Sequence, residues 1–159
     1  MKLTDLKDSV VVFDMDGVLN RFDFSTLNIR MVPDHDWAKM NMLDDAYKYV
    51  QRTNIFSNLI STKNSDDVYV LSAALTSFEQ ANKKRFLNRE YPNIKDDNMM
   101  FVGETRFKID ILKGLREILD KSGKSHMDIV MIEDSIGVLL DVSKLNNPRI
   151  KCYLVSDFL

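Results

Sequence analysis

The sequence predicts an α/β fold in which a doubly wound, parallel five-stranded sheet carries helices on both faces. Short apolar runs alternate along the chain with segments in which apolar residues recur at helical spacing. This alternation is typical of parallel sheets. The first run, residues 10–13, reads Val-Val-Val-Phe, and a strand that is apolar on both faces belongs inside such a sheet. With 159 residues, 45% of them hydrophobic, residues 1–159 are expected to form a single domain with a substantial core.

The other strands and the first helices follow in order. Later apolar runs predict strands over residues 68–71, 99–102, 129–132 and 150–155. Between the first two strands, residues 20–33 lack a sustained period and are expected to form a loop. Apolar residues from Met40 to Val50 then recur at helical spacing, and a further helix is predicted after Asn54, a residue type that suits an N-cap.

Three more helices are predicted in the second half of the chain. Ser77 to Gln80 has the spacing of a capping box, which predicts a helix that starts there and ends near Tyr91 and Pro92. The next helix has one apolar face and ends at Gly123, which suits a left-handed residue. That face comprises Ile111, Leu112, Leu115, Ile118 and Leu119. The last helix is indicated by Leu139, Leu140 and Leu145.

Charge and cysteine content limit the functional classes. A formal net charge of -2 argues against a general nucleic-acid binder, although it leaves room for a local basic patch. Cys152 is the single cysteine, so the chain forms no internal disulfide and suits a reducing compartment. The first residues are too charged for a signal peptide, and no apolar run reaches membrane-spanning length. We therefore expect a cytoplasmic protein with no membrane partner.

Polar residues follow directly after the predicted strands. Asp14 and Asp16 come after the first strand, Ser72 ends the second, and Glu133 and Asp134 follow the fourth. Because the carboxyl ends of parallel strands meet at one edge of a sheet, these side chains are expected to converge. Taken singly, each has a simpler interpretation as an acidic turn or a helix cap.

Together, the strand-end residues suit phosphoryl transfer. Two carboxylates as close as Asp14 and Asp16 repel each other unless a cation or a shared proton relieves them. A phosphate also needs cationic and hydroxyl donors, which Lys108 and Ser72 supply in this pattern. Lys108 taken alone would be a solvated lysine at the start of a helix.

At these residues the sequence resembles the haloacid dehalogenase (HAD) superfamily of aspartate-nucleophile phosphohydrolases. Residues 11–18 (Val-Val-Phe-Asp-Met-Asp-Gly-Val) look like its first motif, Leu71-Ser72 like its second, and residues 132–138 (Ile-Glu-Asp-Ser-Ile-Gly-Val) like its fourth. The third motif is a lysine, for which Lys108 and Lys83 compete. Lys108 is favoured because it precedes a helix that leads to the Glu133-Asp134 strand.

The resemblance implies a mechanism and a metal. Asp14 would attack phosphorus and form an aspartyl-phosphate, while Asp16 would act as general acid and then as general base. Ser72 and Lys108 would hold the phosphate oxygens. The implied cofactor is Mg²⁺, bound by the Asp14 carboxylate, the Asp16 backbone carbonyl and Asp134, with Glu133 as a ligand or a support.

The resemblance also suggests a substrate class. Residues 20–50 leave room for only a small cap-like insertion, and with the basic helix this looks most like the deoxyribonucleotidase-type branch. The expected substrate is a nucleotide or another small phosphomonoester. Four residues are candidates for binding it, namely Gly17, Phe22, Ala73 and Lys83. Phe22 has the alternative interpretation of a core residue.

Two other functions stay open at this point. A polynucleotide 3′-phosphatase would use the basic helix residues Lys83, Lys84, Arg85 and Arg89 against backbone phosphates, although nucleic acid is the less favoured partner. Alternatively, the chain is a HAD-fold binding or regulatory module without turnover. Oligomeric state is left undetermined by the sequence.

Overall fold

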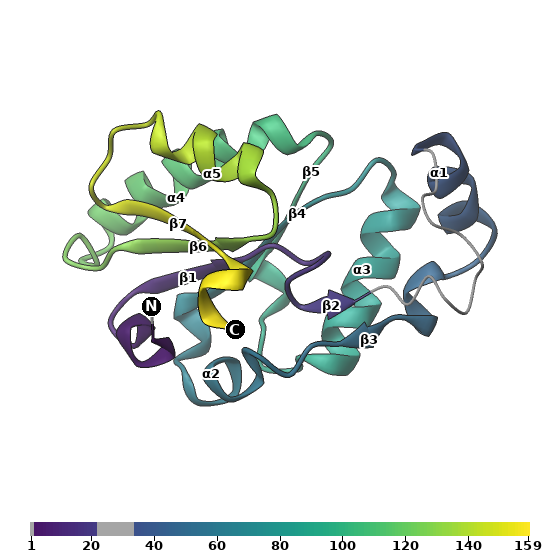
Figure 1. The fold of residues 1–159 in the computed structure, drawn as a ribbon, viewed down its shortest axis with the longest axis horizontal. Helices are drawn as coiled ribbons and strands as arrows, with labels where there is room; N and C mark the ends of the chain where they lie inside the picture. Colours follow the sequence, from purple (N-terminus) through teal and green to yellow (C-terminus); the bar gives the residue numbers. More distant parts are fainter. Residues whose placement is uncertain (1, 22–33) are drawn as a thin grey trace.

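The centre of the molecule is a five-stranded parallel sheet in the order β5-β4-β1-β6-β7 (Figure 1). The computed structural model describes residues 2–21 and 34–159. The sheet comprises β1 (Val10–Phe13), β4 (Val68–Ala73), β5 (Met99–Val102), β6 (Ile129–Glu133) and β7 (Ile150–Leu154). The predicted α/β class and the five predicted strands are confirmed.

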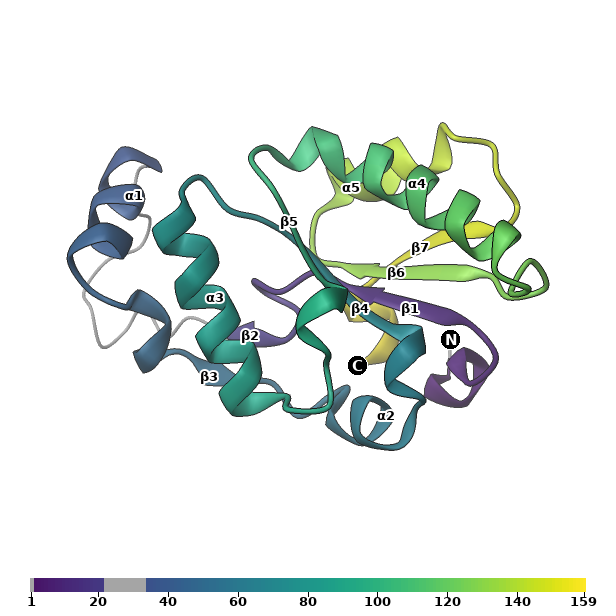
Figure 2. The same cartoon turned by 180° about the vertical axis from the view of Figure 1, so that it is seen from behind.

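Helices cover both faces of the sheet. In Figures 1 and 2, α4 (Lys108–Lys121) and α5 (Ile136–Ser143) lie on one face, and α2 (Ser57–Thr62) and α3 (Ser77–Glu90) lie on the other. Side chains alternate along β1, so Val10 and Val12 join the core under α4 and α5, while Val11 and Phe13 join the opposite core. The central strand is thus buried on both sides, as its sequence predicts.

Two helices present a different face to the core than predicted. Ile118 of α4 is 63% exposed, and the buried face of that helix is completed by Arg116 instead. In α5 the core residues are Val138 and Val142, whereas Leu140 is 52% exposed. The apolar pattern locates both helices correctly, but several neighbouring apolar residues leave more than one face possible.

Helix α3 begins one residue earlier than the predicted capping box implies. The N-cap is Thr76, whose hydroxyl accepts a hydrogen bond from the backbone N–H of Glu79 at 3.1 Å, so Ser77 is already helical. The helix ends before Tyr91, where it was predicted to stop. Gly123, predicted as the left-handed residue after α4, has φ of +79°.

Between β1 and β4 the chain includes a small group of elements beside α3, which we call the insertion. It holds α1 (Asp34–Leu43) and the 3₁₀ turn η2 (Ala46–Tyr49), and it is bracketed by the short antiparallel strands β2 (Asn20–Arg21) and β3 (Gln51–Arg52). The single helix expected over Met40 to Val50 is therefore wrong. The helix ends at Leu43, and the side chain of Asp45 accepts from the backbone N–H of Tyr47 to start a new turn.

The insertion is bonded to α3 rather than free of it. Buried Asn82 of α3 donates to the side-chain oxygen of Asn41 at 2.8 Å and to its backbone carbonyl at 3.2 Å. Arg85 donates to Asp45 at 3.1 Å. The helix expected after Asn54 begins only at Ser57, and the Asn54 carbonyl accepts from the Ser57 N–H.

Short 3₁₀ turns complete the fold: η1 (Leu3–Leu6), η3 (Ser65–Asp67), η4 (Asp96–Asn98), η5 (Thr105–Phe107) and η6 (Val155–Phe158). Among the described residues, no helix is both long and apolar enough to cross a membrane.

Candidate active site

A polar pocket of about 230 Å³ lies at the carboxyl ends of β1, β4 and β6. Its lining includes seven residues that the sequence singled out: Asp14, Asp16, Ser72, Ala73, Lys108, Glu133 and Asp134. A larger hollow of about 600 Å³ lies between η1 and α2, beside the amino ends of β1 and β4, and none of these residues lines it. The strand-end pocket is therefore the candidate active site.

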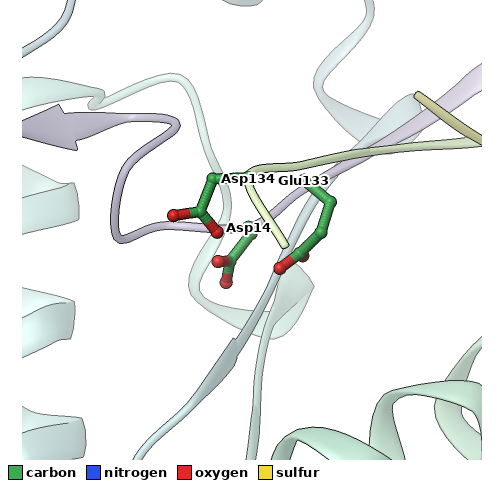
Figure 3. Close-up of side chains that lie close together, drawn as sticks. All are labelled: Asp14, Glu133 and Asp134. Atoms are coloured by element: carbon green, nitrogen blue, oxygen red, sulfur yellow. The ribbon is translucent and has the colours of Figure 1, made fainter. Parts of the chain in front are cut away.

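Three carboxylates in this pocket converge. Single oxygens of Asp14, Glu133 and Asp134 all lie within 4.8 Å of one another, and Figure 3 shows the three side chains turned toward a common space. Burial, with the nearby Asp14 carboxylate, raises the pKa of Glu133 to about 8 and also raises the pKa of Asp134. When ionised, these carboxylates repel one another, and a bound cation would relieve that repulsion. Their hard oxygen donors fit Mg²⁺.

Gly17 leaves the space that Asp134 occupies. Its φ is +80°, a conformation that side chains other than hydrogen rarely allow, and a Cβ there would lie 2.3 Å from Asp134 Oδ2. The loop after β1 can therefore pass close to the carboxylate of Asp134, which directly follows β6, only with glycine at this position. Gly17, which the sequence analysis names as a candidate for binding substrate, lies against Asp134.

Lys108 lies between two members of the acid cluster. Its Nζ is 2.9 Å from Asp14 Oδ1 and 3.0 Å from Glu133 Oε2, and the side chain is almost fully buried. Burial disfavours the ammonium, but the two carboxylates outweigh it, and the pKa of Lys108 is raised. The lysine is charged at neutral pH, so it can offset one of the buried carboxylates.

Lys83 also reaches the site, but it contacts a different carboxylate. Its Nζ lies 2.8 Å from Asp16 Oδ2 and donates to Ser72 Oγ at 2.9 Å and to the Ala73 carbonyl. Although it belongs to the basic helix segment, its side chain is 1% exposed. The two lysines that the sequence presents as alternatives thus occupy two separate places in one site.

Asp16 has partners that the sequence did not single out. The Tyr47 hydroxyl donates to Asp16 Oδ2 at 3.1 Å, and the Asn20 amide donates to Asp16 Oδ1 at 2.8 Å. No pattern in one sequence indicates such a contact between an insertion and a loop. Thr105 and Ser135 also line the pocket and were missed, although both follow a predicted strand closely enough to have been considered. Phe22 lies outside the described residues.

The sequence has no match among known families and curated proteins, and the structure has a weak similarity to a solved one. No protein-family model matches the sequence, and a search of curated proteins finds no match. Among solved structures, the chain is similar to the HAD domain of the effector protein Lem4 from Legionella pneumophila. That similarity has a TM-score of 0.43 and 12% sequence identity, and it covers 92% of this chain and 85% of the other.

Proposed function

We propose that the protein is a Mg²⁺-dependent phosphomonoester hydrolase that works through an aspartyl-phosphate on Asp14. One observation carries the proposal: Asp14 lies beside two further carboxylates and, at 2.9 Å, beside the ammonium of Lys108, in a pocket that also holds Ser72. This combination provides a nucleophile, a cation site and donors for phosphate oxygens within one small space.

Each side chain has a defined task in this proposal. An Asp14 oxygen attacks phosphorus, and the P–O bond to the leaving group breaks. Asp16 gives its proton to the leaving oxygen, and its carboxylate then takes a proton from the water that attacks the aspartyl-phosphate. Ser72 and Lys108 donate to the phosphate oxygens, and the Lys108 ammonium lies 2.9 Å from Oδ1 of the nucleophile.

The proposed cofactor is Mg²⁺, held by the carboxylates of Asp14 and Asp134 and by the backbone carbonyl of Asp16. When bound, it supplies positive charge that stabilises the phosphoryl oxygens. Glu133 is better suited to support than to ligation, because both of its oxygens accept from Lys108, at 3.4 and 3.0 Å, whereas the Lys108 contact to Asp14 is to Oδ1.

The proposed substrate is a nucleotide or another small phosphomonoester. A pocket of about 230 Å³ accommodates a phosphate and little more, so the rest of the substrate would extend outward. Within the basic helix segment, Arg85 pairs with Asp45 and Arg89 donates to the Tyr47 carbonyl, so both bind the insertion. These contacts favour a small substrate over a polynucleotide that would need the same basic groups.

Phosphate release from p-nitrophenyl phosphate, measured with Mg²⁺ and with a chelator, tests the proposal. We expect turnover with Mg²⁺ and its loss on chelation, with Asp14→Asn as the inactive control. A panel of nucleoside monophosphates, sugar phosphates and 3′-phosphorylated oligonucleotides then identifies the substrate class. Preference for the oligonucleotide, with strong salt sensitivity, would support the polynucleotide phosphatase instead. Absence of turnover on every substrate would support a binding module.

A further inference from the structure

Polar contacts from buried donors join the insertion and α3 to Asp16. Oδ2 of Asp16 accepts from the Tyr47 hydroxyl at 3.1 Å and lies 2.8 Å from the Lys83 ammonium, while Oδ1 accepts from Asn20 at 2.8 Å. These donors come from three places in the chain, η2, α3 and β2. A carboxyl group held on both oxygens has little freedom to rotate.

Tyr47 is packed firmly into the insertion. Its side chain is fully buried, with the ring 5.8 Å from that of Trp37 and 6.4 Å from that of Phe86, both in edge contacts. Burial and the neighbouring Asp16 raise the pKa of Tyr47 well above its ordinary value, so the phenol keeps its proton and donates it in a hydrogen bond.

The backbone of η2 is fixed as firmly as the ring. The Asp45 carboxylate accepts from the Tyr47 N–H at 3.0 Å, and Arg89 of α3 donates to the Tyr47 carbonyl at 3.3 Å. Asn82 of α3 also donates to Asn41 of α1. The Tyr47 hydroxyl is therefore held in place relative to α3, which also carries Lys83.

We propose that Tyr47 is a positioning residue through which the insertion orients the Asp16 carboxyl group for proton transfer. This inference rests on the proposed phosphatase function. Oδ2 has two donors and Oδ1 has one, so Oδ1 is the oxygen that passes the proton to the leaving group. When the P–O bond breaks, its electron pair goes to the leaving oxygen, which takes that proton from Asp16. The insertion then serves as part of the active site and not only as a cover.

The test compares two substrates that differ in their need for a proton. A p-nitrophenolate leaves without protonation, whereas the alkoxide of glycerol phosphate needs a general acid. The value of kcat/KM reports the steps up to departure of the leaving group. We expect Tyr47→Phe to lower kcat/KM about tenfold for glycerol phosphate and at most about twofold for p-nitrophenyl phosphate, because the misplaced acid matters only for the first.

Tyr91→Phe is the matched control. Tyr91 is also buried, and its hydroxyl donates to the carbonyls of Leu19 and Thr53, both at 2.7 Å, rather than to a pocket residue. This variant loses a buried phenol hydroxyl near the same insertion, and we expect it to change kcat/KM for both substrates by the same factor. A second measurement combines Tyr47→Phe with Asp16→Asn, where the tyrosine change should have no further effect on glycerol phosphate.

The outcomes separate the two proposals. Suppose that the unmodified protein hydrolyses both substrates and that Tyr47→Phe leaves kcat/KM for the two substrates unchanged or lowers both values equally. The positioning role is then wrong while the phosphatase function stands. An undiminished effect of Tyr47→Phe in the Asp16→Asn background overturns the role in the same way. If the unmodified protein with Mg²⁺ hydrolyses neither substrate, the proposed function fails, and the role of Tyr47 fails with it.

Discussion

The ammonium of Lys108 lies 2.9 Å from a carboxylate oxygen of Asp14. The same ammonium is 3.0 Å from Glu133, so one buried cation faces two buried carboxylates. With Asp134 beside them, the site has more negative than positive charge. This imbalance underlies the predictions about metal binding and pH.

Lys108→Met should lower turnover and at the same time tighten Mg²⁺ binding. Loss of the ammonium removes a donor to the phosphate, which costs about 10²-fold or more in kcat. It also removes a positive charge next to the carboxylates proposed to bind the metal. Lys83→Met, the matched change at the other buried lysine, should leave Mg²⁺ affinity nearly unchanged, because Lys83 pairs with the Asp16 carboxylate whereas the proposed metal ligand is the Asp16 backbone carbonyl. Calorimetric titration with Mg²⁺ measures the affinity of both variants. Weaker binding by Lys108→Met than by the unmodified protein would contradict the placement of Lys108 beside the metal ligands.

Asp14→Asn should abolish turnover while the protein stays folded. The amide has almost the same shape as the carboxylate but cannot attack phosphorus, so we expect kcat to fall by about 10³-fold or more. Phosphate release measures the activity, and circular dichroism checks the fold. Mass spectrometry of the acid-quenched unmodified enzyme should find the phosphoryl group on the peptide that contains Asp14. A variant with substantial activity would show that another group is the nucleophile.

The sequence was sufficient to predict that these side chains meet at one edge of the sheet, because simple patterns indicate where strands end. An apolar strand followed by Asp14, and another followed by Glu133 and Asp134, can meet only at the carboxyl edge of a parallel sheet. The direction in which a lysine on a helix points is harder to predict. Whether Lys83 faces solvent or the pocket depends on the rotation of α3 about its axis, which its weakly patterned sequence does not determine.

The role of Tyr47 could not be predicted for a different reason. It follows helical spacing with Met40 and Leu43, so the sequence presents it as one apolar residue of a longer helix. The helix actually ends at Leu43, and the 3₁₀ turn after it directs the hydroxyl to Asp16, 31 positions away in the chain. Contacts of this kind depend on how an insertion docks, and local patterns carry no information about docking.

Without metal, the protein should become less stable as the pH rises from about 5 to 8. The pKa of Glu133 is raised from 4.5 to about 8, mainly by burial, so between these values the native state binds more protons than the unfolded state. Stability therefore falls with rising pH in this window. Mg²⁺ compensates the ionised cluster, so the stabilisation that it provides should grow over the same window.

Thermal unfolding at several pH values, with a chelator and with Mg²⁺, measures this dependence. Glu133→Gln is the control, because an amide cannot titrate, and its metal-free stability should vary less with pH. The pKa of Asp134 is also raised, so its titration should leave some dependence of metal-free stability on pH in the Glu133→Gln variant. Metal-free stability that rises steadily from pH 5 to 8 would contradict the buried, protonated Glu133.

Gly17→Ala should weaken Mg²⁺ binding in addition to destabilising the fold. The residue has φ of +80°, where alanine costs about 1–2 kcal/mol. Gly123→Ala isolates that backbone cost, because Gly123 has φ of +79° and no atom lies within 4 Å of the added methyl group. At Gly17, the methyl group would also lie 2.3 Å from Asp134 Oδ2 and must displace that carboxylate. Both variants should lose the stability that the backbone conformation costs, and Gly17→Ala should lose more because of the contact with Asp134. Only Gly17→Ala should bind Mg²⁺ about 10- to 100-fold more weakly. Equal Mg²⁺ affinity in the two variants would mean that Asp134 does not bind the metal.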